Sequence, residues 1–251
     1  MRNRVAIVTG GASGIGRSIV SELREKRWSV ESLDLTPDLA SSINLGATDV
    51  TNEQAVIQAV KSIEDHHGPV ELLVNAAGIS EHSRVESLDL SSWRKVITVN
   101  LDGAVICMKA VAKEMLHNGN GSIVNISSIS AERGAPGRAA YCASKAALVA
   151  VTRVAAVEWA GRGVTVNAVS PGYVDSPMLH SAVADGRLSL EEVLSRVPSG
   201  KLVPPSVIAL AVEFLASEAG RFITGQVMTI DGGFLANYGV GSTEIAKGIE
   251  V

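Results

Sequence analysis

Short apolar runs rich in Val and Ile alternate with longer amphipathic stretches along most of the chain. The runs carry little polar alternation, as expected of strands that helices cover on both faces. They lie at residues 4–9, 28–33, 70–75, 122–127, 164–169 and 227–230. Such alternation is typical of βαβ units, and it predicts a mostly parallel sheet of about seven strands.

The intervening stretches predict helices with recognisable start and stop signals. Thr51 can cap one helix, Gly68-Pro69 breaks it, and Asn118-Gly119 ends the next. Helices are expected at residues 15–26, 52–66, 91–117, 139–160 and 205–216. No linker-like segment or internal repeat separates these elements, so the sequence predicts a single doubly wound α/β domain over residues 1–251.

Composition excludes several function classes. The formal net charge of -4 comes without a basic run, which argues against a nucleic-acid partner. The apolar stretch at residues 5–8 is too short for a signal peptide or a membrane span, so we expect a cytoplasmic protein without a membrane partner. Cys107 and Cys142 have no CxxC spacing, and the histidines have no ligand spacing, with His66-His67 expected at a solvated helix end. The sequence therefore predicts neither a disulfide framework nor a metal site.

A glycine-rich loop follows the first predicted strand and opens the first predicted helix. It reads Thr9-Gly10-Gly11-Ala12-Ser13-Gly14-Ile15-Gly16, a GxxxGxG spacing that differs from the GxGxxG dinucleotide fingerprint. A diphosphate needs close backbone approach and free N–H donors at a helix N-terminus, which side chains at Gly10, Gly14 and Gly16 would obstruct. A plain glycine-rich turn is the alternative, and the position after the first strand favours phosphate binding.

Asp34 ends the second predicted strand, where the ribose-binding acid stands in dinucleotide-binding folds. Its carboxylate can accept hydrogen bonds from the adenosine ribose hydroxyls and would repel a 2′-phosphate, and Leu35 and Thr36 after it supply no cation. These features predict NAD rather than NADP, with a solvated turn aspartate as the alternative. Asp49-Val50 and Asn75-Ala76-Ala77-Gly78 follow strands at the same edge of the sheet, although each read alone is an ordinary loop.

Tyr141 and Lys145 form a candidate acid/base pair. Their i,i+4 spacing in a predicted helix places both side chains on one face. A tyrosine with a free pKa of about 10 is a poor base at neutral pH, but a neighbouring ammonium favours the phenolate and lowers that pKa. Ser128 follows a strand and can donate a hydrogen bond to a substrate oxygen. Without context, such a pair is more often a surface pair.

Taken in order, these motifs resemble the short-chain dehydrogenase/reductase family over nearly the whole chain. The matching residues are Thr9-Gly10-x-x-x-Gly14-x-Gly16, Asn75-Ala76-Ala77-Gly78, Asn100 after Val99, Ser128, Tyr141-x-x-x-Lys145 and Pro171-Gly172. The resemblance implies a Rossmann-type fold. It also implies that Tyr141 donates or accepts the proton, and that Lys145 holds the nicotinamide ribose and tunes Tyr141. Ser128 would orient the substrate oxygen, and Asn100 would position a water that links Lys145 to solvent.

The resemblance implies an NAD(H)-dependent oxidoreductase that transfers a hydride between nicotinamide and a secondary alcohol or ketone. The substrate is expected to be a polar molecule of small to medium size, such as a polyol, sugar, hydroxy acid or cyclic diol. A non-catalytic NAD-sensing protein and a structural subunit without cofactor are the alternatives. The cofactor is expected to contact Gly10, Ser13, Gly14, Ile15, Gly16, Asp34, Asp49, Val50, Asn75, Ala76, Gly78, Tyr141, Lys145, Pro171, Gly172, Val174 and Ser176.

The chain departs from the usual family pattern in three places. Ala76 replaces an Asn, and Ser176 replaces a Thr while keeping the hydroxyl that would contact the nicotinamide carboxamide. The stretch from Asp34 to Asp49 is short, so the helix between the second and third strands is expected to be reduced or missing.

Residues 178–200 predict a mobile lid over the substrate. They carry enough apolar residues to cover a pocket, and Asp185-Gly186 and Ser199-Gly200 would act as flexible breaks on either side of a short helix at 190–196. An ordinary surface hairpin is the alternative. Near the mouth of the site we expect donors that suit hydroxyl or carboxylate groups, namely Ser130, Arg138, Tyr173 and His180.

The predicted helix at 139–160 has small and apolar residues on more than one face, more than one sheet surface can cover. The excess is expected to pack against another subunit, and the family resemblance implies a homotetramer. The C-terminal tail, residues 236–251, is long enough to reach a neighbouring subunit, with disorder as the alternative.

Overall fold

The computed structural model describes residues 4–38, 40–43 and 45–237. In this part of the chain, six strands form one parallel sheet in the order β2-β1-β3-β4-β5-β6. They are β1 (Val5–Thr9), β2 (Ser29–Leu33), β3 (Leu72–Asn75), β4 (Gly121–Ile126), β5 (Val164–Pro171) and β6 (Val227–Ile230). All six apolar runs are therefore strands, and the expectation of about seven strands is wrong by one.

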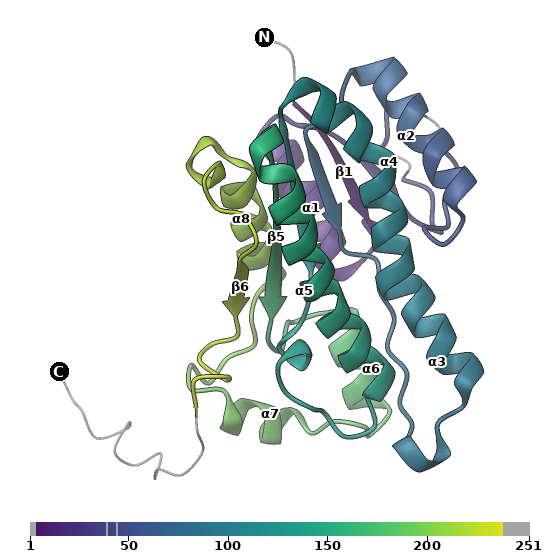
Figure 1. Ribbon diagram of the computed structural model, residues 1–251. Coiled ribbons are helices and arrows are strands. Elements are labelled where there is room, and N and C mark those ends of the chain that lie inside the picture. The colour runs from purple at the N-terminus through teal and green to yellow at the C-terminus, as the bar shows by residue number, and fades with distance from the viewer. Residues whose placement is uncertain (1–3, 39, 44, 238–251) are drawn as a thin grey trace, which may run out of the picture.

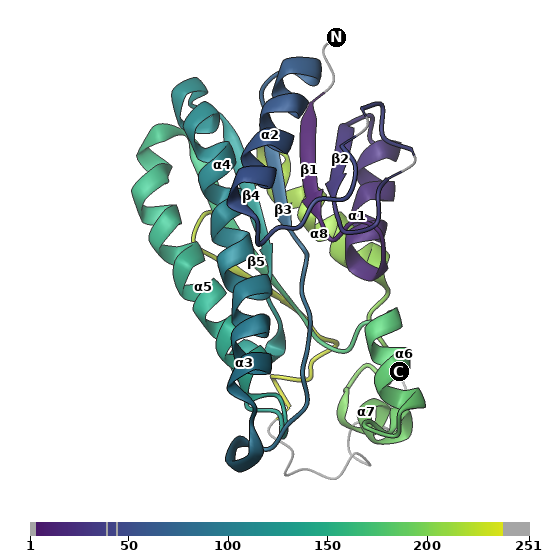
Figure 2. The same cartoon turned by 90° about the vertical axis from the view of Figure 1, so that its right-hand side faces the viewer.

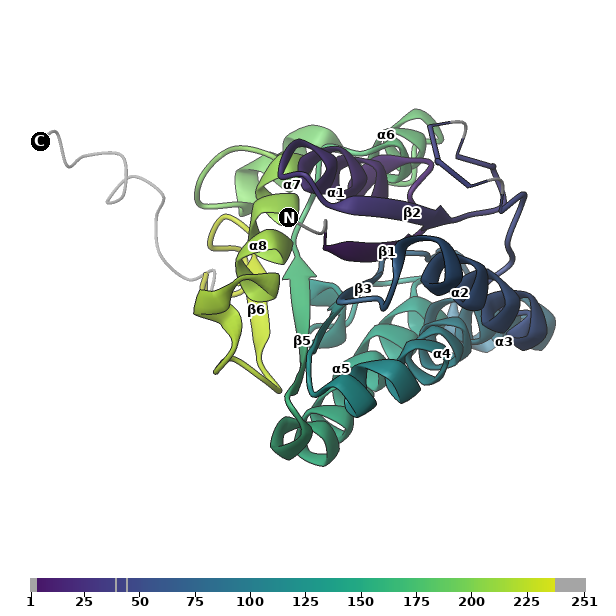
Figure 3. The ribbon, with the colours of Figure 1, turned by 90° about the horizontal axis from the view of Figure 1, so that it is seen from above.

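Helices cover both faces of the sheet (Figure 3). The helices α1 (Gly14–Glu25) and α8 (Pro205–Ala216) lie together on one face. The helices α2 (Glu53–His67), α4 (Gly103–Asn118) and α5 (Ala139–Trp159) cover the other, and α4 and α5 cross the front of the sheet in Figure 1. This arrangement confirms the predicted doubly wound α/β class.

Each face of the sheet has its own hydrophobic core. Ala6 and Val8 of β1 point to the core formed with α1 and α8, whereas Val5 and Ile7 point to the core formed with α2 and α4. All four side chains are fully buried. Burial on both faces explains why the strands show no alternation of polar and apolar residues.

The helix predicted at residues 91–117 is interrupted. The structure has α3 (Leu90–Ile97), a π-helical turn (Thr98–Asp102) and then α4. A π turn adds one residue to the helical turn, and such turns are frequent at functional sites. Here it carries Asn100, whose side chain is buried.

The helix α5 continues into a short 3-10 turn that ends at Arg162. By length and composition this stretch could cross a membrane, but half of its apolar window is buried inside the protein, as in the core helix of a globular domain. The other 3-10 helices are Val85–Ser87, Ile129–Ala131 and Glu218–Gly220.

Two short helices lie at the carboxyl end of the sheet (Figure 2). The helix α7 (Leu190–Arg196) confirms the helix predicted at 190–196, whereas α6 (Pro177–Ala184) was not predicted. Gly186 between them and Gly200 after them have positive φ, consistent with the predicted breaks. The predicted tail falls outside the described residues from position 238 onward.

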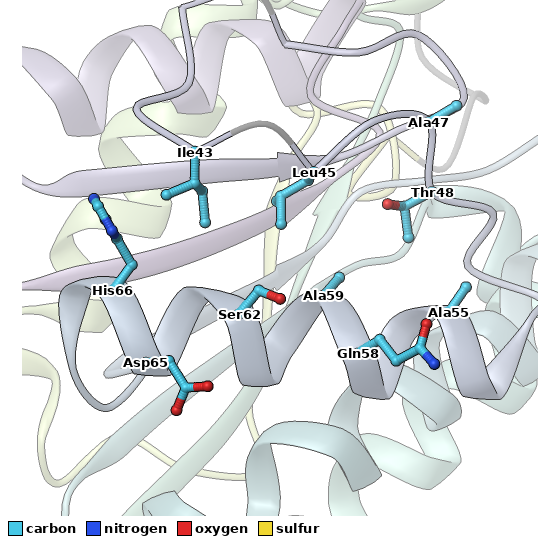
Figure 4. A pocket seen from close by; sticks show the side chains of 10 residues that line it. All are labelled: Ile43, Leu45, Ala47, Thr48, Ala55, Gln58, Ala59, Ser62, Asp65 and His66. Atoms are coloured by element: carbon cyan, nitrogen blue, oxygen red, sulfur yellow. The ribbon is translucent and has the colours of Figure 1, made fainter.

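The connection between β2 and α2 carries neither helix nor strand in its described residues, which confirms that the helix expected there is missing. In the described residues, this connection leads directly into α2, and β2 is an edge strand of the six-stranded sheet. A cavity of about 670 Å³ lies between this connection and α2 (Figure 4). Ile43 and Leu45 face Ala59 and Ser62 across it, and none of the predicted site residues lines it.

A buried carboxylate holds this connection to the edge of the sheet. Glu31 of β2 is only 1% exposed and accepts hydrogen bonds from the hydroxyls of Ser41 and Ser42. Its Oε1 also lies 2.8 Å from Nε2 of His67 at the end of α2. The prediction of a solvated helix end is wrong for His67, whose side chain is 13% exposed, because Glu31 draws the ring inward.

We expect His67→Ala to lower the free energy of unfolding by about 1–3 kcal/mol, because it removes a partner from a buried carboxylate. Urea denaturation of both variants measures the change, with His66→Ala as the matched control because that neighbouring ring is exposed. Equal losses in the two variants would show that the Glu31–His67 contact does not stabilise the fold.

Candidate active site

The glycine loop after β1 has the shape of a phosphate cradle. Gly10 and Gly14 have φ of +69° and +52°, and a Cβ on Gly10 would lie 2.8 Å from Cα of Ala77. A Cβ on Gly16 would overlap the carbonyl of Gly10. Ser13 caps α1 without a side-chain hydrogen bond, so the N-terminus of α1 is available to an anion.

Asp34 is fixed against this loop. Its Oδ2 accepts a hydrogen bond of 3.0 Å from the amide of Ala12, and its Oδ1 accepts one of 2.9 Å from the amide of Thr36. Each carboxylate oxygen retains a lone pair for a ribose hydroxyl.

The guanidinium of Arg17 also lies close to the contact between Asp34 and Ala12. Nε of Arg17 donates to the carbonyl of Ala12 at 2.8 Å. Arg17 was not predicted as a site residue, because it lies in α1 and not in the segment that follows Asp34.

The loop after β3 is locked by side chains from neighbouring strands. Oγ1 of Thr9 accepts hydrogen bonds of 3.1 Å from the amides of both Ala76 and Ala77. Nδ2 of Asn75 donates to Oδ1 of Asn125 on β4 at 2.8 Å. These bonds hold the Asn75–Gly78 loop beside the glycine loop.

Asp49 and Val50 lie just before α2 and have different surroundings. Asp49 is exposed, and its Oδ1 accepts a hydrogen bond of 2.9 Å from the amide of Thr51. Val50 is buried against Gly103, where an added Cβ would lie 2.8 Å from Cγ2 of Val50.

Gly78, Asn100 and Lys145 converge from three elements. A Cβ on Gly78 would lie 3.3 Å from Oδ1 of Asn100 and 3.5 Å from Nζ of Lys145. Oδ1 of Asn100 accepts from the amide of Ile79 at 2.8 Å, and its Nδ2 donates to the carbonyl of Ile79 at 2.9 Å and to Oγ of Ser144 at 3.1 Å. The amide of Asn100 therefore ties the loop after β3 to α5.

Lys145 carries its ammonium into the interior. The residue is 4% exposed, and Nζ donates to the carbonyl of Ile126 at 2.7 Å. Burial and, to a smaller extent, the positive charge of Arg138 lower the pKa of Lys145 to about 8. A buried ammonium at this position stabilises negative charge that develops nearby.

Tyr141 lies one turn before Lys145 on the same face of α5, as its spacing predicts. The ring is largely buried, with Nζ of Lys145 5.7 Å from its centroid and Cζ of Arg138 4.2 Å from it. Ser128 is buried at the end of the loop after β4, where its Oγ accepts from the amide of Ser130 at 3.1 Å. The hydroxyl proton of Ser128 is thus available to a substrate oxygen.

The segment after β5 reaches back to the glycine loop. The amide of Gly172 donates to the carbonyl of Ile230 at 2.8 Å, and Val174 forms a β-bridge with Val203. Oγ of Ser176 caps α6 by accepting from the amide of Leu179. A Cβ on Gly14 would lie 4.0 Å from Cβ of Ser176, so the two loops are in contact range.

The four predicted substrate residues have different surroundings. Ser130 is buried beside Ser128, and the ring of Tyr173 packs edge to face on Phe234 at 5.4 Å between centroids. His180 is exposed, with Nε2 2.6 Å from Oδ1 of Asp175. Arg138 lies over the ring of Tyr141.

Sequence analysis missed a further contact at this end of the molecule. Nδ1 of His82 lies 3.0 Å from Nη1 of Arg187, although the two residues stand far apart in the chain. Neither residue belongs to a motif, so their contact was not predictable from the sequence. Within residues 4–237, apart from 39 and 44, no three His, Cys, Asp or Glu side chains gather as metal ligands.

Comparison with known proteins covers nearly the whole chain. The family profile described as Enoyl-(Acyl carrier protein) reductase matches residues 10–235. The chain is 37% identical to cis-4-hydroxycyclohexanecarboxylate dehydrogenase of Sinomonas cyclohexanicum, over 93% of this chain and 97% of that protein. It is also 37% identical to D-threitol dehydrogenase of Mycolicibacterium smegmatis, over 92% of each chain.

Solved structures show the same fold. The ligand-free aldohexose dehydrogenase of Thermoplasma acidophilum aligns with a TM-score of 0.89 at 31% identity, over 96% of this chain and 97% of that one. The structure of ElxO with NADP bound aligns with a TM-score of 0.85 at 34% identity, over 94% of this chain and the whole of that one.

The buried ammonium predicts a pH-dependent stability. Because the pKa of Lys145 is about 8 in the folded chain and 10.5 ordinarily, the unfolded chain binds more protons between these values. Stability from this group therefore rises with pH through that window. We expect the wild type to gain about 2–3 kcal/mol relative to Lys145→Met between pH 7 and pH 10.

Urea denaturation at several pH values measures this change, with the exposed Lys113→Met as the matched control. A constant difference between the wild type and Lys145→Met across the range would contradict the low pKa.

Proposed function

The chain belongs to the short-chain dehydrogenase/reductase family, and on this premise we propose that it oxidises a polar secondary alcohol, or reduces the corresponding ketone, with NAD(H). Oxidoreductase activity on CH–OH groups follows from its relatives. The choice of NAD and the roles of individual residues are the proposal. The observation that carries it is the convergence of Gly78, Asn100 and Lys145 beside the ring of Tyr141.

The residues around the glycine loop fit a nicotinamide dinucleotide. The loop and the N-terminus of α1 would hold the diphosphate, and Asp34 would accept the adenosine ribose hydroxyls. Lys145 would bind the nicotinamide ribose, and Ser176 would contact the carboxamide. When bound, the nicotinamide supplies or accepts the hydride.

The chain itself handles the proton. In the reductive direction, the hydroxyl of Tyr141 gives its proton to the substrate oxygen, and in the oxidative direction the phenolate takes it back. The buried ammonium of Lys145 lies on the same helix face and would stabilise negative charge that develops on the reacting oxygens during the transfer. Ser128 donates a hydrogen bond to the same substrate oxygen and stabilises its developing charge.

Asn100 acts as a positioning residue in this proposal. Its side-chain amide bonds to Ile79 and Ser144, so it fixes the loop after β3 against α5. Both N–H groups are engaged, but Oδ1 keeps a lone pair that could accept from the water linking Lys145 to solvent.

A lid and a polar substrate complete the proposal. The helices α6 and α7 lie at the carboxyl end of the sheet, where the loops of the site leave the strands (Figure 2). Closure of residues 178–200 would exclude water from the hydride path. The two relatives named above act on a hydroxycyclohexanecarboxylate and a polyol, which supports a polar alcohol of small to medium size.

We also propose a homotetramer. On α5, Val154 and Val157 are 57% and 83% exposed, although both are large apolar residues in a regular helix. Burial of such side chains against another subunit would remove this apolar surface from water.

A second candidate cofactor is NADP. Arg17 lies next to Ala12, which itself bonds to Asp34, so a guanidinium is available near the adenosine ribose. The structural relative with NADP bound supports this alternative. A third reading, a non-catalytic NAD sensor, does not explain why Tyr141 and Lys145 share a buried helix face beside Ser128.

Tyr141→Phe tests the chemistry. We expect turnover to fall by about 100-fold or more, the range of general acid–base catalysis, while cofactor binding is retained. Nicotinamide absorbance with a panel of alcohols and ketones measures turnover, and fluorescence titration measures cofactor binding. Near-normal turnover in this variant would remove Tyr141 from the mechanism.

Asp34→Ser tests the cofactor. We expect the ratio of kcat/KM for NAD to that for NADP to fall by about 10-fold or more, because a carboxylate that repels a 2′-phosphate has been removed. Asp38→Ser is the matched control, since Asp38 lies on the same connection after β2 as Asp34 but forms an ion pair with Arg24 of α1. A wild type that already prefers NADP would overturn the role of Asp34 and favour Arg17.

A further inference from the structure

Among the described residues, Arg138 is a cation without an anionic partner, and it lies beside Tyr141 of the candidate site. It stands at the N-cap of α5, with its guanidinium over the ring of Tyr141. Its Nε is fully buried and has no hydrogen-bond partner among the described residues, and no carboxylate there forms an ion pair with the side chain. A buried guanidinium donor without an acceptor is costly, because its hydration has been lost without replacement.

The groups nearest Arg138 do not neutralise it, because Arg187 is already paired with Asp185 and His82 carries no negative charge. Ser83 forms a β-bridge with Arg138, and its amide donates to the carbonyl of Gly137 at 2.9 Å, so the loop that carries His82 lies beside Arg138. Nδ1 of His82 accepts from Arg187 of the lid segment at 3.0 Å. Desolvation lowers the pKa of His82, and the charges of Arg138 and Arg187 lower it further. His82 is therefore a neutral ring between two guanidinium groups.

The nearby acids do not pair with Arg138. Asp185 forms an ion pair with Arg187. Glu81 raises the pKa of His82, whereas the two arginines lower it. A cavity of about 130 Å³ lies beside His82 and Gly137, and its lining includes the acids Glu81 and Asp89 but not Arg138. Among the described residues, Oγ of Ser80, on the same loop as His82, is another buried polar atom without a hydrogen-bond partner.

We propose that Arg138, supported by His82 and Arg187, binds a carboxylate group on the substrate, so that this enzyme acts on hydroxy- or oxo-carboxylates. This inference rests on the proposed function, and it narrows the substrate class to anionic alcohols and ketones. A carboxylate suits the planar fork of a guanidinium, which can donate two parallel hydrogen bonds to it.

The position of Arg138 fixes where the carboxylate would lie in the substrate. Its guanidinium stacks on the ring whose hydroxyl exchanges a proton with the reacting oxygen. The carboxylate and the reacting carbon would thus be separated by a short carbon skeleton. Arg187 lies between α6 and α7, in the lid segment. Its contact with His82 would bring this segment next to the bound carboxylate.

A paired-substrate experiment tests the proposal. The probes are a series of oxo-carboxylates of increasing chain length that begins with acetoacetate and levulinate, each compared with its primary carboxamide. We expect wild-type kcat/KM to favour the carboxylate of a pair, and Arg138→Gln to lower the carboxylate-to-amide ratio by about 10- to 100-fold. The ratio cancels any effect of the substitution on folding or on the common proton transfer.

Two further variants sharpen this measurement. Arg138→Lys keeps the positive charge but loses the planar guanidinium that can donate two parallel hydrogen bonds. We therefore expect its carboxylate-to-amide ratio to lie between those of the wild type and Arg138→Gln. Arg84→Gln is the matched control, because it removes the same charge from the same loop region at an exposed pair with Glu86. An unchanged ratio in Arg138→Gln, or an equal fall in Arg84→Gln, would overturn the proposal while leaving the proposed function intact.

A binding measurement separates the two hypotheses if no ketone is turned over. We would titrate the protein with butyrate and with butyramide in the presence of cofactor, and follow the ring NMR signals of His82, assigned with His82→Gln. Butyrate alone should shift these signals in the wild type, and neither probe should shift them in Arg138→Gln. Absence of turnover with either cofactor would overturn the proposed function, whereas equal responses to both probes would overturn the carboxylate site.

Discussion

The carboxyl ends of six parallel strands meet at one edge of the sheet, and the candidate site depends on this constraint. Each parallel pair requires a crossover, so every strand delivers its following loop to the same side. The loops after β1, β3, β4 and β5 carry the glycine cradle, Gly78, Ser128 and Gly172, respectively. The helices on both faces bury β1 and β3 along their whole length, which leaves this edge as the place where polar groups can be presented.

Buried polar bonds then set the position of the catalytic helix. Asn75 of β3 bonds to Asn125 of β4, and Nδ2 of Asn125 donates to Thr152 of α5 at 2.9 Å. Such a chain of buried hydrogen bonds resists distortion, because breaking one of them leaves a buried group unpaired. The helix α5 also carries Tyr141 and Lys145, so these hydrogen bonds help to set the position of both residues relative to the sheet. The lowered pKa of Lys145 shows that placing its ammonium there is itself unfavourable.

Local pattern explains what the sequence could predict. The strands and long helices follow from runs and periodicities within one segment, and Tyr141 and Lys145 follow from their spacing on one helix. The π-helical turn at Asn100 was not predictable, because it interrupts a helix without changing its apolar pattern. The burial of His67 depends on Glu31, and the contact between His82 and Arg187 joins two loops. Such pairs have no signature until the fold brings them together.

The missing helix just after β2 affects only one side of this arrangement. β2 is the edge strand, whereas β1, β3, β4 and β5 occupy consecutive positions inside the sheet, and Tyr141 and Lys145 lie on α5 between β4 and β5. Glu31, through Ser41, Ser42 and His67, holds the shortened connection in place. Asp34 lies on this edge and accepts hydrogen bonds from the amides of Ala12 and Thr36. Within the described part of the chain, it shares no hydrogen bond with Tyr141 or Lys145. Under the proposed roles, a substitution at Asp34 would therefore change cofactor preference without disturbing proton transfer.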